Sequence, residues 1–268
     1  MVALKNILST ALLASTALAL PAPQRRQTST SSKRGAAYND AGSVQALDQN
    51  SAISWAYNWG ASPNGELPQG VEFVPMLWGL KTITDFVGGI ETILATGSVK
   101  YVMGFNEPDS SGQSSMAASD AATNFLQYLT PYLGSLSLVS PAVTSSQSPG
   151  QGLDWMREFL GGCSQCGISV LAVHWYGDTA DEFTQFIQQA MDLASENGLK
   201  EVWVTEFALN EDISAQSSSS NSADFLRQVQ PWLDSQDMIT RYAYFWAQEG
   251  FLVSGGSPSE TGQAYISG

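Results

Sequence analysis

The sequence predicts a parallel α/β fold, a (β/α)8 TIM barrel in a single domain. From residue 50 onward, short apolar runs alternate with segments of helical apolar spacing, as parallel strands and their crossover helices do. The runs are apolar on both faces and rich in Val, Ile, Phe, Tyr and Trp, which is typical of strands buried on both sides. The first run is not followed by a G-x-G-x-x-G motif, which disfavours an open nucleotide-binding sheet.

Seven strands can be placed in order along the chain. They cover residues 53–57, 73–78, 101–105, 136–142, 168–175, 202–207 and 242–246. Between them, helical spacing is clearest over residues 125–133, 183–194 and 225–233. A closed barrel needs an eighth strand, either at residues 251–253 or as a short strand before Tyr101. The Ser-rich stretch 214–222 is expected to be a solvated loop, because the strand–helix rhythm resumes after it.

The N-terminus has the pattern of a secretory leader. Residues 1–19 combine a basic start at Lys5, an apolar stretch and an Ala-x-Ala cleavage site, which predicts a signal peptide rather than a membrane anchor. Residues 20–34 are polar and end in Lys33-Arg34, so we expect a propeptide or disordered leader cut after Arg34. The catalytic domain would then span residues 35–268, and the protein would be secreted to the extracellular space or the cell wall.

Composition excludes several function classes. After residue 34 the chain holds six basic and 25 acidic residues, a net charge of −19, which repels nucleic acid. One histidine and two cysteines are too few for the usual zinc sites, so we expect no metal and no organic cofactor. The Cys163-Ser-Gln-Cys166 spacing also occurs in redox dithiols. Because glycines flank the pair, and because the chain is expected to be secreted, a structural disulfide is favoured.

Two carboxylates stand out because each follows or ends an apolar strand. In a barrel, the carboxyl ends of the strands meet at one rim, where Glu107 and Glu206 would face each other three βα units apart. Salt bridges to these residues are disfavoured, since so few basic residues follow the leader. Glycoside hydrolysis needs such a pair: one carboxyl protonates the leaving oxygen, and the other attacks the anomeric carbon or activates water. A short distance between the two carboxyl groups means that the configuration of the anomeric carbon is retained, and a longer distance means that it is inverted.

Other polar and aromatic residues at strand ends are predicted to bind the sugar. They are Asn58, Trp59, Trp78, Asn106, His174, Trp175, Tyr176 and Trp246. Indole faces stack on sugar rings, although core packing is an equal alternative for each tryptophan. His174 has no G-x-S-x-G serine to serve, so we expect it to donate hydrogen bonds in the site rather than to act as the primary base.

Five motifs carry a resemblance to a known family. They are Tyr57-Asn-Trp59, Val74-Pro-Met-Leu-Trp-Gly79, Gly104-Phe-Asn-Glu-Pro-Asp109, Val173-His-Trp-Tyr-Gly177 and Val204-Thr-Glu-Phe207, and together they resemble glycoside hydrolase family 128, largely fungal β-1,3-glucanases of a retaining clan of (β/α)8 barrels. The resemblance implies that Glu107 is the acid/base and Glu206 the nucleophile, on strands four and seven. It further implies that Asn106 binds the sugar 2-hydroxyl and that His174 and Tyr176 orient the nucleophile or the substrate.

Together these features predict a secreted retaining endo-β-1,3-glucanase whose partner is a β-glucan polysaccharide or oligosaccharide. We expect a monomer that binds neither nucleic acid nor membranes. One alternative is a carbohydrate-binding cell-wall protein that keeps the barrel without turnover. The other is a hydrolase of the same clan that acts on a different β-linked polysaccharide.

Overall fold

The computed structural model describes residues 33–268; the predicted signal peptide and residues 20–32 of the predicted leader lie outside this range. Eight parallel strands form two sheets. The first contains β1 (Gly35–Ala37), β2 (Trp55–Tyr57) and β3 (Glu72–Phe73). The second contains β4 (Tyr101–Met103), β5 (Ser137–Val143), β6 (Ile168–Gly177), β7 (Glu201–Leu209) and β8 (Ile239–Tyr244), hydrogen-bonded in chain order.

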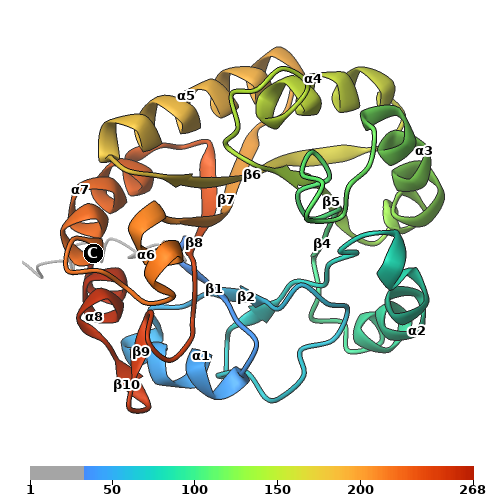
Figure 1. Cartoon of the computed structure of the whole chain (residues 1–268). Coiled ribbons are helices and arrows are strands. Elements are labelled where there is room, and N and C mark those ends of the chain that lie inside the picture. The colour runs from blue at the N-terminus through green and yellow to red at the C-terminus, as the bar shows by residue number, and fades with distance from the viewer. Residues whose placement is uncertain (1–32) are drawn as a thin grey trace, which may run out of the picture. The chain divides into compact units, whose positions relative to one another are not determined.

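The five-stranded sheet is curled, and the three-stranded sheet faces its open side (Figure 1). Isolated parallel bridges link the edges of the two sheets: Arg34 to Tyr242 and Tyr38 to Ala247 beside β8, and Met76 to Met103 beside β4. The architecture is therefore TIM-like, but its strands are hydrogen-bonded as two sheets rather than as the single eight-stranded sheet that we predicted. Strands β1 to β3 have only two or three residues each, too few for continuous ladders at both edges.

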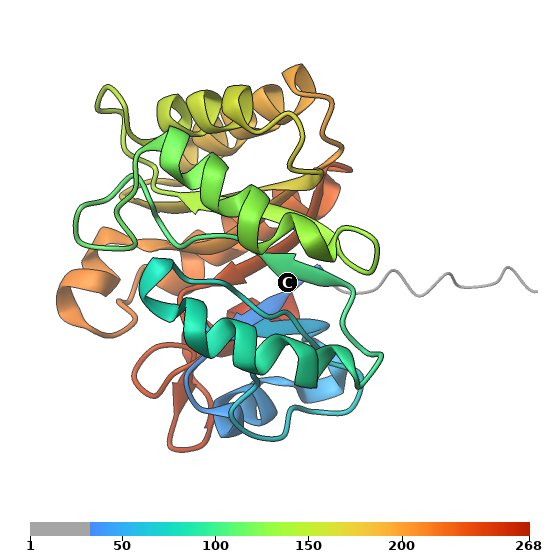
Figure 2. The same cartoon turned by 90° about the vertical axis from the view of Figure 1, so that its right-hand side faces the viewer.

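Helices lie around the outside of the strands (Figures 1 and 2). They are α1 (Ala41–Leu47), α2 (Ile83–Leu94), α3 (Ala118–Tyr128), α4 (Gly152–Gly162), α5 (Ala180–Glu196), α6 (Asn210–Ala215), α7 (Ser222–Ser235) and α8 (Glu260–Ser267). Three short 3-10 helices, η1 (Gln49–Ser51), η2 (Leu80–Thr82) and η3 (Thr130–Tyr132), lie in the loops. Helix α5 begins with a capping box between Thr179 and Glu182, which fixes where it starts after β6. Among residues 33–268, none of the helices combines the length and apolar composition that a bilayer crossing requires.

The missing eighth strand is β1, at the start of the described chain. The other place considered, residues 251–253, instead leads into β9 (Val253–Ser254), which pairs with β10 (Ser257–Pro258) in a separate antiparallel hairpin. With β1 counted, Glu107 follows the fourth strand and Glu206 lies in the seventh. A Cβ at Gly35 would lie 2.2 Å from the Trp55 ring, so only glycine fits where β1 passes this indole.

The apolar residues divide into two clusters because successive side chains of a strand point to opposite faces. On β6, Val170 and Ala172 join an inner cluster with Trp55 and Trp203. The intervening Leu171 belongs to the outer cluster, between the strands and the helices. This alternation decides which side chains of β6 reach the site.

The two ends of the described chain are joined by hydrogen bonds. Lys33 Nζ donates to the carbonyls of Leu233, Asp234 and Gln236 at the end of α7, at 3.2, 2.9 and 2.8 Å. The Arg34 side chain pairs with Asp234 at 3.1 Å and donates to the carbonyl of Gly268. These two basic residues are therefore part of the folded domain. The predicted disulfide between Cys163 and Cys166 is also present, directly after α4.

Candidate active site

Glu107 and Glu206 lie at the same end of the strands, and both are almost fully buried. Glu107 follows β4 with a positive φ of 41°, a left-handed conformation that is costly for a residue with a side chain. Its backbone N–H donates to the Ala142 carbonyl at 2.8 Å, which holds this turn in place. Such a conformation persists only where neighbouring contacts enforce it, and it is found preferentially at functional sites.

His174 lies between the two glutamates and is fully buried. Its Nδ1 is 2.8 Å from Glu107 Oε1 and 3.4 Å from Glu206 Oε2. Burial acts to lower the pKa of His174, but the charges of Glu206, Glu107 and Asp109 outweigh it, so the pKa lies above the usual value of 6.5. One carboxylate oxygen of each glutamate and a ring nitrogen of His174 all lie within 4.8 Å of one another.

Glu206 accepts hydrogen bonds from three aromatic side chains. Tyr57 and Trp59, at the end of β2, donate to Oε1 at 3.2 and 2.8 Å, and Tyr176 donates to Oε2 at 2.6 Å. Tyr57 shares its one hydroxyl proton with the Thr205 carbonyl at 3.0 Å. Burial, together with the negative charge of Glu206, raises the pKa of both phenols well above 10, so both keep the proton that they donate. These three donors stabilise negative charge on Glu206.

A cavity of about 410 Å³ opens onto the two glutamates. Its lining includes four of the predicted substrate-binding residues, namely Trp59, Asn106, Tyr176 and Trp246. Trp59 and Trp246 meet edge to face, with ring centroids 5.8 Å apart. The cavity thus combines a carboxylate pair with flat apolar walls, the combination that a sugar ring requires.

Four other lining residues were not among those we predicted: Asn39, Gln113, Ile213 and Phe245. Asn39 follows β1, which was not located from the sequence. Gln113 and Ile213 lie in segments after β4 and β7 that have no distinctive local pattern. Phe245 directly precedes Trp246, so its position at a strand end was the one available signal.

Four predicted substrate-binding residues are not among those lining this cavity: the fully buried His174, described above, and Trp175, Trp78 and Asn58. Trp175 points to the opposite face of β6 from His174 and Tyr176, where it stacks on Phe225 in the outer cluster. Trp78 packs against the inner cluster, and its carbonyl accepts from the backbone N–H of Asn106 at 2.9 Å. The Asn58 side chain closes a turn by accepting from Gly60 N–H and donating to the Ser62 carbonyl.

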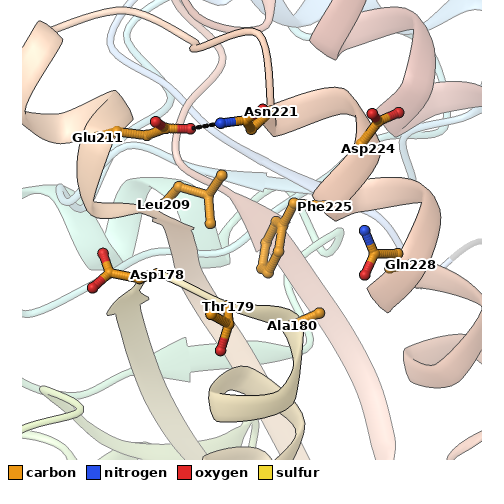
Figure 3. A pocket seen from close by; sticks show the side chains of 9 residues that line it. All are labelled: Asp178, Thr179, Ala180, Leu209, Glu211, Asn221, Asp224, Phe225 and Gln228. Carbon is orange, nitrogen blue, oxygen red and sulfur yellow. Dashed lines mark hydrogen bonds between the residues drawn. The ribbon is translucent and has the colours of Figure 1, made fainter.

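A second hollow, of about 450 Å³, lies between the start of α5 and helices α6 and α7. Figure 3 shows three carboxylates around it, those of Asp178, Glu211 and Asp224, and Glu211 accepts from Asn221 at 3.0 Å. Neither Glu107 nor Glu206 belongs to its lining. We therefore place the candidate active site in the cavity that contains the glutamate pair.

The positions of the two carboxyl groups limit the reactions that this site can catalyse. Two carboxyl groups from opposite strands reach the same cavity, as acid-assisted cleavage of an acetal requires. Glu107, His174 and Glu206 are also close enough together to ligate a metal ion. A reaction in which one carboxyl supplies a proton and the other attacks carbon needs no metal.

Comparison with known proteins agrees with this chemistry. A family model described as "Glycosyl hydrolase catalytic core" matches residues 35–265. The Schizosaccharomyces pombe protein "Alkali-sensitive linkage protein 1" is 31% identical over 261 residues, which are 89% of this chain but 45% of that protein. The chain thus spans less than half the length of this relative.

Two solved structures are similar along their whole length. One is a family 128 (subgroup III) curdlan-specific exo-β-1,3-glucanase from Blastomyces gilchristii in complex with glucose. It is 39% identical, with a TM-score of 0.78, covering 87% of this chain and 97% of that one. The other is a family 128 (subgroup I) endo-β-1,3-glucanase from Amycolatopsis mediterranei in complex with laminaritriose. It is 26% identical, with a TM-score of 0.70, covering 88% and 99%.

Proposed function

Because this chain belongs to glycoside hydrolase family 128 and is a glycoside hydrolase, we propose that it is a secreted enzyme that cleaves β-1,3-glucan with retention of configuration. The substrate class is supported by the two structural relatives, which are β-1,3-glucanases. Cleavage at internal linkages of the glucan, as by an endo-glucanase, remains our prediction from the sequence. Secretion is supported by the leader-like pattern of residues 1–19.

In the proposed reaction, Glu206 attacks the anomeric carbon while Glu107 gives a proton to the departing glycosidic oxygen. The resulting glycosyl-enzyme is then hydrolysed by water, which Glu107 deprotonates. The hydrogen bonds support this assignment, because Glu206 accepts from Tyr57, Trp59 and Tyr176, whereas the Glu107 carboxyl group contacts His174. Asn106 would bind the 2-hydroxyl of the sugar under attack.

The observation that carries the proposal is the closeness of the carboxylates. Oxygens of Glu107 and Glu206 lie within 4.8 Å of each other. Carboxyl groups about 5–5.5 Å apart suit direct attack by one of them, whereas inverting enzymes leave roughly 6.5–9.5 Å for a water molecule. The short separation therefore favours double displacement.

The first test removes each carboxylate without changing its shape. Glu107→Gln and Glu206→Gln should each lower the hydrolysis of linear β-1,3-glucan about 10³-fold or more while the folded structure, followed by circular dichroism, is retained. Glu158→Gln, at an exposed position on α4 outside the cavity lining, is the matched control and should retain activity. Near-normal turnover in either site variant would refute the assignment.

A second measurement separates the two roles and the stereochemistry. Proton NMR of the first product released from an aryl β-laminarioside should show the β-anomer before mutarotation; an initial α-anomer would mean inversion. A substrate with a good leaving group should restore the formation of the glycosyl-enzyme in Glu107→Gln, because such a leaving group departs without a proton. It should not rescue Glu206→Gln.

Product sizing and N-terminal sequencing test the remaining parts. An early fall in glucan chain length indicates internal cleavage, whereas steady release of one small sugar indicates attack from an end. Binding of glucan without any release of reducing ends would favour the alternative of a non-catalytic wall protein. Mature protein that still begins at residue 1 would contradict secretion by signal-peptide cleavage.

A further inference from the structure

The segment after Glu107 folds back over the site. Ser110 N–H donates to the Glu107 carbonyl at 3.0 Å, and Ser114 N–H donates to the Asn106 carbonyl at 3.3 Å. These bonds return the chain toward β4 and bring Gln113, which lies between the two serines, into the lining of the cavity. Gln113 is therefore held beside the catalytic pair by backbone contacts.

The Gln113 side chain contacts Asn106 directly. Asn106 Nδ2 donates to Gln113 Oε1 at 3.3 Å. Asn106 is 4% exposed, and its Oδ1 is buried with no hydrogen-bond partner among the described residues. A carboxamide has two N–H groups and one oxygen acceptor. The bond to Gln113 uses one N–H, and the oxygen is buried, which leaves the second N–H for a ligand in the cavity.

We propose that Gln113 is a positioning residue that fixes the orientation of the Asn106 carboxamide toward the 2-hydroxyl of the sugar under attack. The inference rests on the proposed function. Turning the Asn106 amide by half a turn would exchange its oxygen with its NH₂ group and place an acceptor against Gln113 Oε1. Two acceptors repel each other, so Gln113 in its observed orientation, with Oε1 toward Asn106, disfavours that arrangement.

An alternative role for Gln113 is to stabilise the loop alone. The two roles differ in a way that kinetics can detect. If Gln113 acts through Asn106, its loss matters only for substrates that carry the 2-hydroxyl. If it only supports the loop, its loss affects every substrate equally.

The test compares Gln113→Ala with wild type on an aryl β-laminaribioside and on its analogue lacking the 2-hydroxyl of the sugar next to the aryl group. On the parent substrate kcat should fall about tenfold, the size of one hydrogen bond. KM should change little, because the contact strengthens mainly in the transition state. On the 2-deoxy analogue the loss should be less than about twofold.

Two further variants sharpen the result. Gln113→Glu keeps an acceptor oxygen at the same reach, so it should keep the preference for the 2-hydroxyl. Its added negative charge opposes ionisation of a nearby acid, so the alkaline limb of the rate profile should move to higher pH. Gln147→Ala removes an exposed glutamine outside the cavity lining and should leave both substrates unaffected.

Equal losses on both substrates, or no loss on the parent substrate, would overturn the role of Gln113 and leave the proposed function intact. A wild-type enzyme that cleaves neither substrate nor β-1,3-glucan would instead overturn the proposed function, and this inference with it.

Discussion

At the scale of single residues, the one histidine of the sequence has an unusual environment. His174 is fully buried, yet it faces the carboxylates of Glu107 after β4 and Glu206 on β7, and the charge of Asp109 also raises its pKa. A buried imidazolium between two carboxylates lowers their mutual repulsion. It thereby allows both to lie in one small cavity.

This arrangement predicts a pH-dependent stability. His174→Asn keeps a hydrogen-bonding side chain but cannot carry a charge, so the variant should be less stable than wild type by up to about 3 kcal/mol, since a buried ion pair is broken. The folded-state pKa of His174 lies above the unfolded value of about 6.5. The stability that it contributes is therefore fully present below about pH 6.5 and is lost as the pH rises through the folded pKa.

Thermal unfolding of both proteins between pH 5 and 9 would check this. The difference in Tm should be largest at acidic pH and shrink toward alkaline pH. A constant difference would mean that the pKa of His174 is the same in the folded and unfolded protein, and a difference that grows with pH would mean that folding lowers it.

Single residues also show what the sequence could and could not predict about the site. The two glutamates were found because a carboxylate at the end of an apolar strand is rare and needs a reason. From the sequence, Trp175 and Tyr176 were equally good candidates for binding the sugar. Because side chains alternate along β6, Trp175 points toward the helices and Tyr176 toward Glu206. The inward face can be assigned only when the register of the sheet is known.

At the scale of elements, the segment after β7 is held by an anchor, the buried carboxylate of Asp212, which the Ser-rich composition does not reveal. The Ser-rich stretch 214–222 was expected to be a solvated loop. In the structure, the fully buried Asp212 accepts from Ser219 N–H, Ser222 Oγ and Tyr244 OH at 2.8, 2.7 and 2.5 Å. The neighbouring Ile213 lines the active-site cavity, so this anchor also holds one of its walls.

Removing the anchor should therefore affect both stability and activity. Asp212→Ala leaves three donors without their acceptor and should lower the free energy of unfolding by about 3 kcal/mol or more. It should also raise KM, because the wall formed by Ile213 becomes loose. Glu158→Ala, at an exposed carboxylate on α4, is the control and should change stability by less than about 0.5 kcal/mol.

Denaturant unfolding measures the change in stability, initial rates on β-1,3-glucan give KM, and limited proteolysis within residues 214–222 reports whether the segment has become loose. Unchanged stability and unchanged proteolysis would show that the Asp212 contacts do not hold the segment. The anchor could not be predicted, because nothing in a stretch of serines indicates which hydroxyl meets a buried acid.

Strand β1 is a whole element that the sequence pattern could not locate. Seven strands were placed from runs of large apolar residues, but β1 reads Gly-Ala-Ala, three small residues without any strand preference. Its side chains are small because β1 passes closely over the Trp55 ring. Tertiary packing therefore defines this strand, and only the need for eight strands pointed to it.

At the scale of the whole molecule, the first and last described segments stabilise each other. Lys33 supplies three hydrogen bonds to the carbonyls at the end of α7, and the hydroxyl of Tyr265 on α8 donates to the Gly35 carbonyl at 2.8 Å. A lysine at a helix C-terminus satisfies carbonyls that have no partner within the helix and opposes their negative charge.

Lys33→Met should therefore lower the free energy of unfolding by about 1.5–3 kcal/mol, the usual value of hydrogen bonds to a charged donor. Lys100→Met, in an exposed position, serves as the control and should leave stability within about 0.5 kcal/mol of wild type. Denaturant unfolding gives both values. If the mature protein begins at Gly35, the Lys33 substitution will instead have no effect on it.

If the protein is secreted and cut after Arg34, as we propose, the position of Lys33-Arg34 also sets the order of cleavage and folding. An endoprotease that cuts after paired basic residues must draw several consecutive residues into its own cleft. Here the backbone on both sides of the 34–35 bond is already bonded: the Lys33 carbonyl to Tyr242 N–H, the Arg34 carbonyl to Ser54 N–H, and Gly35 within β1. Cleavage after Arg34 therefore has to occur before this part of the domain folds. If the domain folds first, Lys33-Arg34 stays attached to it.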